Sequence, residues 1–235
     1  MNDKNIPLKD RIILALDAPD PATAKEWVKK TESALGYYKI GLQLFMASHF
    51  AMVDWLQDRG HKVMLDLKFF DIPETVKLAV AQIRDRGVHM ATVHGNDPIL
   101  RAALAEKGPV KILAVTVLTS FGEEDMRAMG MTATIEDLVY FRAKRALELG
   151  CDGVVSSGME AARLRAGLGD RLILVTPGIR PGSNTADDQK RVMSAGTAIG
   201  AGADHLVVGR PITRAAEPLA VIAAMQEEIS RALAE

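Results

Sequence analysis

Residues 63–75 read VMLDLKFFDIPET, and this stretch joins an apolar strand to a cluster of charged side chains. The run Val63–Leu67 is short and largely apolar, as are strands that are buried on both faces of a parallel sheet. Asp66 and Lys68 are two residues apart, so alternation along a strand places both side chains on one side. Asp71 follows as the chain leaves the strand. We therefore expect two carboxylates and an ammonium group to lie together at the carboxyl end of this strand.

Seven further runs of the same kind alternate with longer amphipathic stretches. All are short and rich in Val, Ile or Leu without clear polar alternation; they are Ile12–Leu16, Tyr38–Leu42, Val88–Val93, Ile112–Leu118, Gly153–Val155, Leu172–Val175 and His205–Val208. Eight strand–helix units in 235 residues predict a single (β/α)8 barrel. The alternative is an open doubly wound sheet, which more often carries a glycine-rich turn after its first strand. Here that turn, residues 17–21, reads DAPDP and contains no glycine.

Three segments between the apolar runs have helical spacing of apolar residues. Pro21–Leu35 opens with a cap residue and a first-turn proline, Thr134–Leu149 is followed by a glycine, and Ile212–Leu233 has an apolar side. The longest irregular stretch, Pro177–Gln189, is polar and contains proline and glycine. A loop of this length in a compact fold is often a lid over an active site.

Composition narrows the class of protein. We expect one domain over residues 1–235, since barrels commonly reach this size as one unit. The formal net charge of −1 and the few aromatic residues argue against a nucleic-acid-binding role. A polar N-terminus, no long apolar segment and a single cysteine predict a cytoplasmic protein without a membrane span. Cys151 precedes an apolar run and is interpreted as a small buried hydrophobic residue.

The charged cluster after the third run has two interpretations. Two carboxylates around an ammonium group perturb proton affinities and can position an acid for proton delivery. Alternatively, Asp66 and Lys68 form a structural ion pair, and Asp71 with Glu74 forms a helix-capping pattern ahead of the next amphipathic segment. The spacing Asp-x-Lys-x-x-Asp by itself leaves both interpretations open.

A phosphate site is predicted after the last apolar run. Gly209 and Arg210 precede a helix expected to start near Pro211, and a helix N-terminus carries free N–H groups and partial positive charge. Arginine binds phosphate through two parallel hydrogen bonds, and the loops after strands seven and eight are a recurrent phosphate site in barrels. Arg180, on the seventh loop, would assist or gate the site. The alternative for Arg210 is a solvated surface arginine.

Residues 66–75 match the pattern Asp-x-Lys-x-x-Asp-Ile-Pro-x-Thr, and in this the chain resembles the orotidine 5′-monophosphate decarboxylase family. Similar agreement extends over nearly the whole chain, at Asp17, at Lys39 in YKIG, at residues 118–120 (LTS), at residues 176–181 (TPGIRP), at Asp188-Gln189 and at residues 208–212 (VGRPI). The chain departs from the family after His94, where it reads GNDP in place of the expected glycines, and we leave His94 out of the predicted site.

The resemblance implies a fold, an activity and a set of site residues. The fold is a (β/α)8 barrel, and the activity is conversion of orotidine 5′-monophosphate to uridine 5′-monophosphate and carbon dioxide, the last step of de novo pyrimidine nucleotide synthesis. It implies that no metal and no organic cofactor take part. The implied catalytic residues are Lys68 as proton donor with Asp66, Asp71 and Lys39; the implied substrate-binding residues are Asp17, Lys39, Thr75, Thr119, Ser120, Pro177, Arg180, Gln189, Gly209 and Arg210.

The same resemblance implies a homodimer in which Asp71 and Thr75 reach into the partner's site. From the residues alone the role of Gln189 stays open, because a polar residue at the start of a helix would give the same sequence pattern as a phosphate-binding glutamine. A magnesium-dependent sugar-phosphate decarboxylase or aldolase is the nearest rival, since such enzymes share Asp-x-Lys-x-x-Asp. A non-catalytic nucleotide- or phosphate-binding barrel is a second rival, but Lys39, Asp66, Lys68 and Asp71 are all present.

Overall fold

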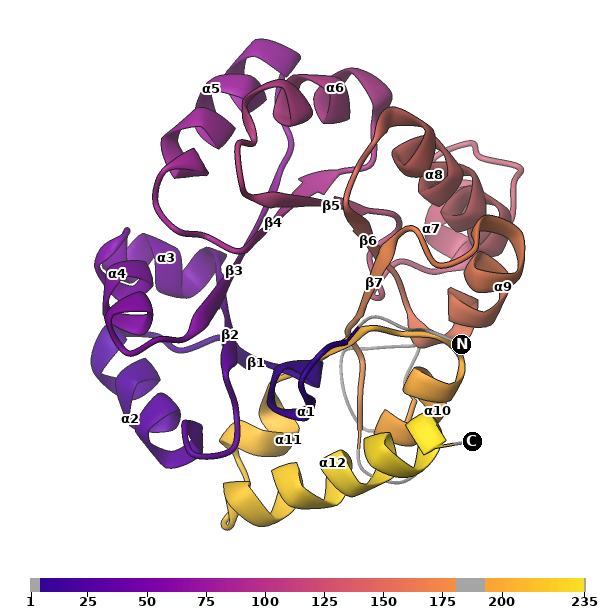
Figure 1. Cartoon of the computed structure of the whole chain (residues 1–235). Coiled ribbons are helices and arrows are strands. Elements are labelled where there is room, and N and C mark those ends of the chain that lie inside the picture. The colour runs from indigo at the N-terminus through magenta and orange to yellow at the C-terminus, as the bar shows by residue number, and fades with distance from the viewer. Residues whose placement is uncertain (1–4, 181–192, 235) are drawn as a thin grey trace.

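The computed structural model describes residues 5–180 and 193–234. Eight parallel strands pair in chain order and close into a barrel when the last pairs with the first (Figure 1). The strands are β1 (Ile12–Leu16), β2 (Tyr37–Gly41), β3 (Lys62–Phe69), β4 (Met90–His94), β5 (Lys111–Val115), β6 (Gly153–Val155), β7 (Ile173–Thr176) and β8 (His205–Val208). The predicted (β/α)8 barrel is confirmed, and the doubly wound alternative is excluded because the sheet has no open edge.

Helices surround the strands on the outside of the barrel (Figure 1). They are α1 (Leu8–Arg11), α2 (Pro21–Thr31), α3 (Leu42–Ser48), α4 (Ala51–Asp58), α5 (Pro73–Arg84), α6 (Asp97–Glu106), α7 (Glu123–Ala128), α8 (Ile135–Leu149), α9 (Gly158–Leu168), α10 (Ala195–Gly200), α11 (Arg210–Thr213) and α12 (Pro218–Ala234). In the part of the chain that the structure describes, no helix is long and apolar enough to cross a membrane.

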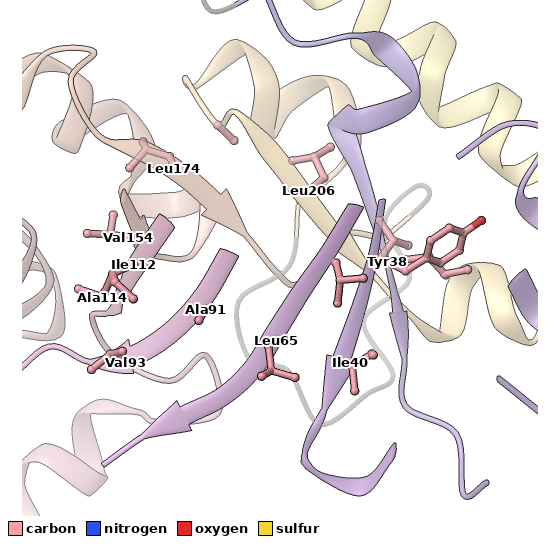
Figure 2. Packing of buried hydrophobic residues seen from close by; sticks show 14 of the residues in the cluster. Tyr38, Ile40, Leu65, Ala91, Val93, Ile112, Ala114, Val154, Leu174 and Leu206 are labelled. Atoms are coloured by element: carbon pink, nitrogen blue, oxygen red, sulfur yellow. The ribbon is translucent and has the colours of Figure 1, made fainter. Parts of the chain in front are cut away.

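Strand alternation divides the barrel's apolar side chains into two layers. Outward residues such as Ile40, Leu65 and Ala91 pack with helix residues in the main hydrophobic core (Figure 2). Inward residues form a second cluster that fills the barrel; they are Ile13, Tyr37, Met64, Met90, Leu113 and Val175. Because side chains alternate along a strand, the residue two positions after an inward one also faces inward. Lys39 and Asp66 each stand two residues after a member of the inner cluster, and this places them at the barrel mouth.

Local sequence explains some of the helix boundaries. The predicted helix Thr134–Leu149 is confirmed, because the Thr134 side chain accepts a hydrogen bond from the Asp137 N–H and Gly150 ends the helix at φ 88°. The predicted Pro21–Leu35 helix ends earlier, at Thr31. Cys151 is buried, and burial raises the pKa of its thiol to about 12, as expected for an inert hydrophobic residue.

One helix prediction was wrong, and one alternative interpretation is excluded. The predicted helix Ile212–Leu233 is interrupted, with α11 ending at Thr213 and α12 starting at Pro218. Pro218 has no N–H to donate and disfavours helical backbone in the residue before it, so it begins a new helix. The Asp71–Glu74 capping pattern does not form, because α5 begins at Pro73 and the Asp71 carboxylate accepts from the neighbouring Ile72 N–H at 2.6 Å.

Candidate active site

A cavity of about 260 Å³ lies at the carboxyl ends of the strands. Many of the predicted site residues line it; they are Asp17, Lys39, Asp66, Lys68, Thr119, Pro177, Arg180, Gly209 and Arg210. They come from the ends of β1, β2 and β3 and from the segments that follow β5, β7 and β8. Catalytic residues of barrel enzymes occupy this face, and residues far apart in the chain meet here because all eight strands are parallel.

The centre of the cavity holds a row of alternating charges. Lys39 Nζ donates to Asp17 Oδ1 at 2.9 Å and lies 3.4 Å from Asp66 Oδ2. Lys68 Nζ donates to both carboxylate oxygens of Asp66 at 2.9 Å. Asp66 is therefore shared between two ammonium groups, one from β2 and one from its own strand.

Burial differs along this row, and neighbouring charges offset its effect on the pKa values of Asp66 and Lys39. The side chains of Lys39 and Asp66 are 8% and 11% exposed, whereas that of Lys68 is 34% exposed. Burial opposes charge on Asp66, but Lys39 and Lys68 outweigh it and lower the pKa of this carboxyl below its usual value. Burial likewise opposes charge on Lys39, yet Asp66 and Asp17 raise the pKa of its ammonium. Both interior members thus stay charged, and Lys68 has the solvent-accessible end of the row.

The close approach of Asp17 and Lys39 depends on a glycine. A Cβ atom added to Gly41 would lie 3.0 Å from Asp17 Oδ1 and 3.2 Å from Lys39 Nζ. Both distances are tighter than ordinary contacts, so with a larger residue here Asp17 and Lys39 would each have to give way by a few tenths of an ångström. This gives a physical reason for glycine in the YKIG segment, which ends β2.

Sequence reasoning missed two residues near the charge row. Thr92, on β4, donates its hydroxyl to Asp66 Oδ1 at 2.8 Å and accepts from the Lys68 N–H at 3.0 Å. Ser156 directly follows β6, lines the cavity and is 3% exposed. The position of Ser156 after a strand end was the available signal. Thr92 stands inside an apolar run, where a threonine gives no signal of a role at the site.

The mouth of the cavity has two arginines on neighbouring loops. Gly209 is the N-cap of α11 and Arg210 its first residue, close to the helix start predicted at Pro211. Arg210 is half-buried and also borders an adjoining cavity of about 470 Å³. Arg180 follows β7, the neighbouring strand, and also lines the main cavity. These two cations make the mouth suitable for an anion.

Some predicted residues lie away from this cavity. Asp71 and Thr75 are exposed, and Asp71 lies in a separate surface pocket with Phe70 and Ile72. Ser120 is exposed beyond the lining residue Thr119. Gln189 lies outside the described residues, as does most of the loop predicted at 177–189. The structure therefore brings the charge row and the arginines together within one chain, but not Asp71 or Thr75.

His94 ends β4 beside the cavity without lining it. Its ring lies 4.4 Å from that of Phe70, tilted by 36°. Burial, Arg142 and Lys68 lower the pKa of His94, which favours the neutral imidazole. Across residues 5–180 and 193–234, no group of three or more His, Cys, Asp or Glu side chains is placed to hold a metal ion.

Fold and site together define a (β/α)8 barrel of enzyme type, with a Lys–Asp–Lys charge row at its catalytic face. The sequence model of the orotidine 5′-phosphate decarboxylase / HUMPS family matches residues 10–225, and the chain belongs to this family.

Individual relatives agree with this membership. Orotidine 5′-phosphate decarboxylase of Methylococcus capsulatus is 52% identical over 220 residues, 93% of this chain and 91% of the relative. The protein of the same name from Bradyrhizobium diazoefficiens is 45% identical over 235 residues, 99% of each chain. The crystal structure of orotidine 5′-phosphate decarboxylase from Lactobacillus acidophilus superposes with a TM-score of 0.82 at 30% identity, covering 94% of this chain and 99% of that one.

Proposed function

We propose that this protein decarboxylates orotidine 5′-monophosphate to uridine 5′-monophosphate and carbon dioxide in pyrimidine nucleotide biosynthesis. The observation that carries the proposal is the contact of the Lys68 ammonium with both oxygens of Asp66 inside a cavity whose mouth holds two arginines. Family membership and the names of the relatives support the substrate.

The chemical step that the protein has to assist is cleavage of the bond between C6 of the pyrimidine and its carboxylate carbon. The electron pair of that bond stays on C6 as carbon dioxide leaves. The ammonium of Lys68 stabilises this carbanion and then transfers a proton to C6, and the resulting amine regains a proton from water. Positive charge fixed in a cavity sheltered from water stabilises developing negative charge far more than it would in solution.

Asp66 has a different role in this proposal. Its carboxylate lies beside the place where the substrate carboxylate would bind, and it stays ionised because Lys39 and Lys68 hold its pKa low. Repulsion between the two carboxylates raises the energy of the bound substrate and is relieved when carbon dioxide leaves. Lys39 and the partner's Asp71 would complete the row, so that Lys68 is held in one position.

The remaining residues would bind the nucleotide away from the reacting carbon. Arg210 and Gly209 would hold the phosphate together with Gln189, and Arg180 with Pro177 would close over it. Asp17 and Lys39 would bind the ribose hydroxyls, while Thr119 and Ser120 would meet the edge of the base. Binding energy from the phosphate is then available to offset strain at the reacting carbon.

The proposed reaction uses neither a metal nor an organic cofactor, which separates it from the magnesium-dependent sugar-phosphate rival. Wild-type protein would be incubated with orotidine 5′-monophosphate in EDTA, and the products separated by chromatography. The proposal expects uridine 5′-monophosphate in equal amount to the carbon dioxide released, at a rate unchanged by added magnesium. No turnover of the nucleotide, with magnesium-dependent turnover of a sugar-phosphate acid, would establish the rival instead.

We also propose a homodimer in which Asp71 and Thr75 complete the partner's site. Both residues are exposed and lie outside their own chain's cavity, and Asp71 shares a surface pocket with the exposed apolar side chains of Phe70 (64% exposed) and Ile72 (67% exposed). Exposed apolar side chains that surround a polar group are typical of a surface that is buried on association.

Mixing two inactive variants tests this arrangement. In a hybrid of Lys68→Ala and Asp71→Ala chains, one site carries both substitutions and the other carries neither. Random exchange of equal amounts makes half of the dimers hybrid, so activity should recover to about a quarter of wild type. Absence of recovery, with hybrid dimers demonstrated by native mass spectrometry, would mean that each chain has a self-contained site.

We propose finally that residues 1–235 act as one catalytic domain in the cytoplasm. The family match over residues 10–225 and the buried thiol of Cys151 support this. A single calorimetric unfolding transition and recovery in the cytoplasmic fraction are the expected results. Two separate transitions, or recovery in another compartment, would contradict the respective part.

A further inference from the structure

The ladder between β3 and β4 is irregular at the catalytic residues. Leu65 pairs with Ala91, but the next pair is Phe69 with Val93. Three residues of β3, 66–68, therefore stand opposite the single β4 residue between Ala91 and Val93. A bulge of this kind bends the strand and re-aims side chains, and bulges are common next to active sites.

The bulge leaves Lys68 in an unfavourable backbone conformation. Its φ of 48° lies in the left-handed region, and among the described residues other than glycine only His49 shares a positive φ. A residue with a Cβ adopts this conformation only where its surroundings hold it there. The extra residues also remove Lys68 from regular pairing with β4, so its N–H needs a partner other than a strand carbonyl.

Thr92 is the residue opposite the bulge, and its hydroxyl supplies that partner. The Lys68 N–H donates to Thr92 Oγ1 at 3.0 Å, and the same hydroxyl donates to Asp66 Oδ1 at 2.8 Å. Lys68 Nζ in turn donates to Asp66 Oδ1 at 2.9 Å. Backbone and side chain of Lys68 are thus tied to each other through one hydroxyl and one carboxylate.

We propose that Thr92 is a positioning residue, whose hydroxyl holds the left-handed backbone of Lys68 and the orientation of Asp66 for the decarboxylation proposed above. Thr92 is fully buried and does not line the cavity, so it acts through Lys68 and Asp66 and does not touch the substrate. Loss of the Thr92 hydroxyl would therefore change the direction in which the Lys68 ammonium points. The proposed contacts to the phosphate and the ribose would stay in place.

The effect of losing the Thr92 hydroxyl on the protonation of Asp66 depends on the charged groups that surround this carboxylate. Lys39 faces it from β2 and Lys68 from β3, while Asp17 lies beyond Lys39 and His94 ends β4. The Thr92 donor adds to the effect of the two lysines in keeping the pKa of Asp66 low. Without that donor the carboxyl takes up a proton more readily, so activity that needs ionised Asp66 is lost at a higher pH.

The test compares Thr92→Val, which keeps the branched shape but removes the hydroxyl, with Thr92→Ser, which keeps the hydroxyl. Thr116→Val is the matched control, because Thr116 is an equally buried threonine whose hydroxyl donates to the Val155 carbonyl at 2.9 Å. For each protein, kcat, KM and the pH dependence of kcat are measured with orotidine 5′-monophosphate, with thermal unfolding and uridine 5′-monophosphate binding as checks of folding.

We expect Thr92→Val to lower kcat by about 10- to 100-fold, the scale of a hydrogen bond to a charged group, with KM changed by less than about threefold. The acid limb of its kcat profile should move to higher pH, and Thr92→Ser should restore both kcat and the profile. Thr116→Val should lower thermal stability without changing kcat.

Other outcomes overturn the inference. They are a Thr92→Val enzyme with normal kcat and an unmoved profile, a Thr92→Ser enzyme as impaired as Thr92→Val, and a control that loses kcat equally. If Thr92→Val does not fold, Thr92→Cys takes its place, and failure of both to fold would make the role of Thr92 structural. Wild type that does not turn over the nucleotide would contradict the proposed function itself, which separates the two failures.

Discussion

The Arg210→Ala substitution removes a half-buried guanidinium from the mouth of the cavity, where α11 begins. If Arg210 binds the phosphate through two charge-assisted hydrogen bonds, each would contribute roughly 1.5–3 kcal/mol in a closed site. The residue is not fully buried, so we reduce the sum to about 2–4 kcal/mol to allow for solvent. That corresponds to a loss of about 30- to 900-fold in kcat/KM.

Binding measurements with two ligands show whether this loss comes from contacts between Arg210 and the phosphate. Dissociation constants would be measured by calorimetry for uridine 5′-monophosphate and for uridine, with wild type and with Arg210→Ala. The substitution should weaken binding of the nucleotide by the same amount, about 2–4 kcal/mol. Binding of uridine should not change, because uridine has no phosphate for Arg210 to contact. Arg214→Ala is the comparison variant, since Arg214 is exposed, lies one turn further along and borders only the adjoining cavity and not the main one.

Three results would contradict the assignment of Arg210 to the phosphate. They are a fall in kcat/KM of less than tenfold for Arg210→Ala, equal weakening of the binding of uridine and of its nucleotide, and an equal effect of Arg214→Ala. The first would make Arg210 the solvated surface arginine of the alternative interpretation. The second would assign it a structural role at the start of α11, and the third would assign the effect to general positive charge.

Two further predictions concern titrating groups inside the barrel. Lys39→Met should raise the pKa of Asp66, because Lys39 is the charge that most favours the ionised form of that carboxyl. The acid limb of the pH profile of kcat/KM should therefore move to higher pH. An unmoved profile would contradict this. Burial lowers the pKa of His205 from 6.5 to about 4, so the unfolded chain binds the proton first and stability falls as pH drops through this range. The free energy of unfolding, measured with urea, should fall between pH 7 and pH 4.5 by about 2 kcal/mol less in His205→Gln than in wild type. An equal fall in both proteins would count against a neutral buried imidazole.

The strands and most of the charge row were predictable from sequence because each depends on local pattern. A strand buried on both faces reads as a continuous apolar run, so its centre is found even where its ends shift, as in β5, which ends at Val115 and not at Leu118. Asp66 and Lys68 follow the two-residue period of one strand. Their contact with Lys39 needs only that parallel strands end on the same face of the barrel.

What sequence could not predict depends on pairing between distant segments. The bulge opposite Thr92 comes from the register between β3 and β4, which no local period encodes, and with it the positive φ of Lys68. The residues alone predict that Asp71 lies beside Asp66 and Lys68, whereas the structure places it in a separate surface pocket; only the family resemblance implies that Asp71 and Thr75 lie outside their own chain's site. The interruption after α11 was readable in principle, because Pro218 is a local signal that the apolar spacing concealed.

We propose above all that Lys68 delivers the proton in a metal-free decarboxylation. The most direct test of this proposal is a spectrophotometric assay of orotidine 5′-monophosphate loss at neutral pH with EDTA, for wild type and Lys68→Ala side by side. We expect fast turnover by wild type and almost none by a variant that still folds and binds uridine 5′-monophosphate. Near-normal turnover by Lys68→Ala, or no turnover by well-folded wild type, would contradict it.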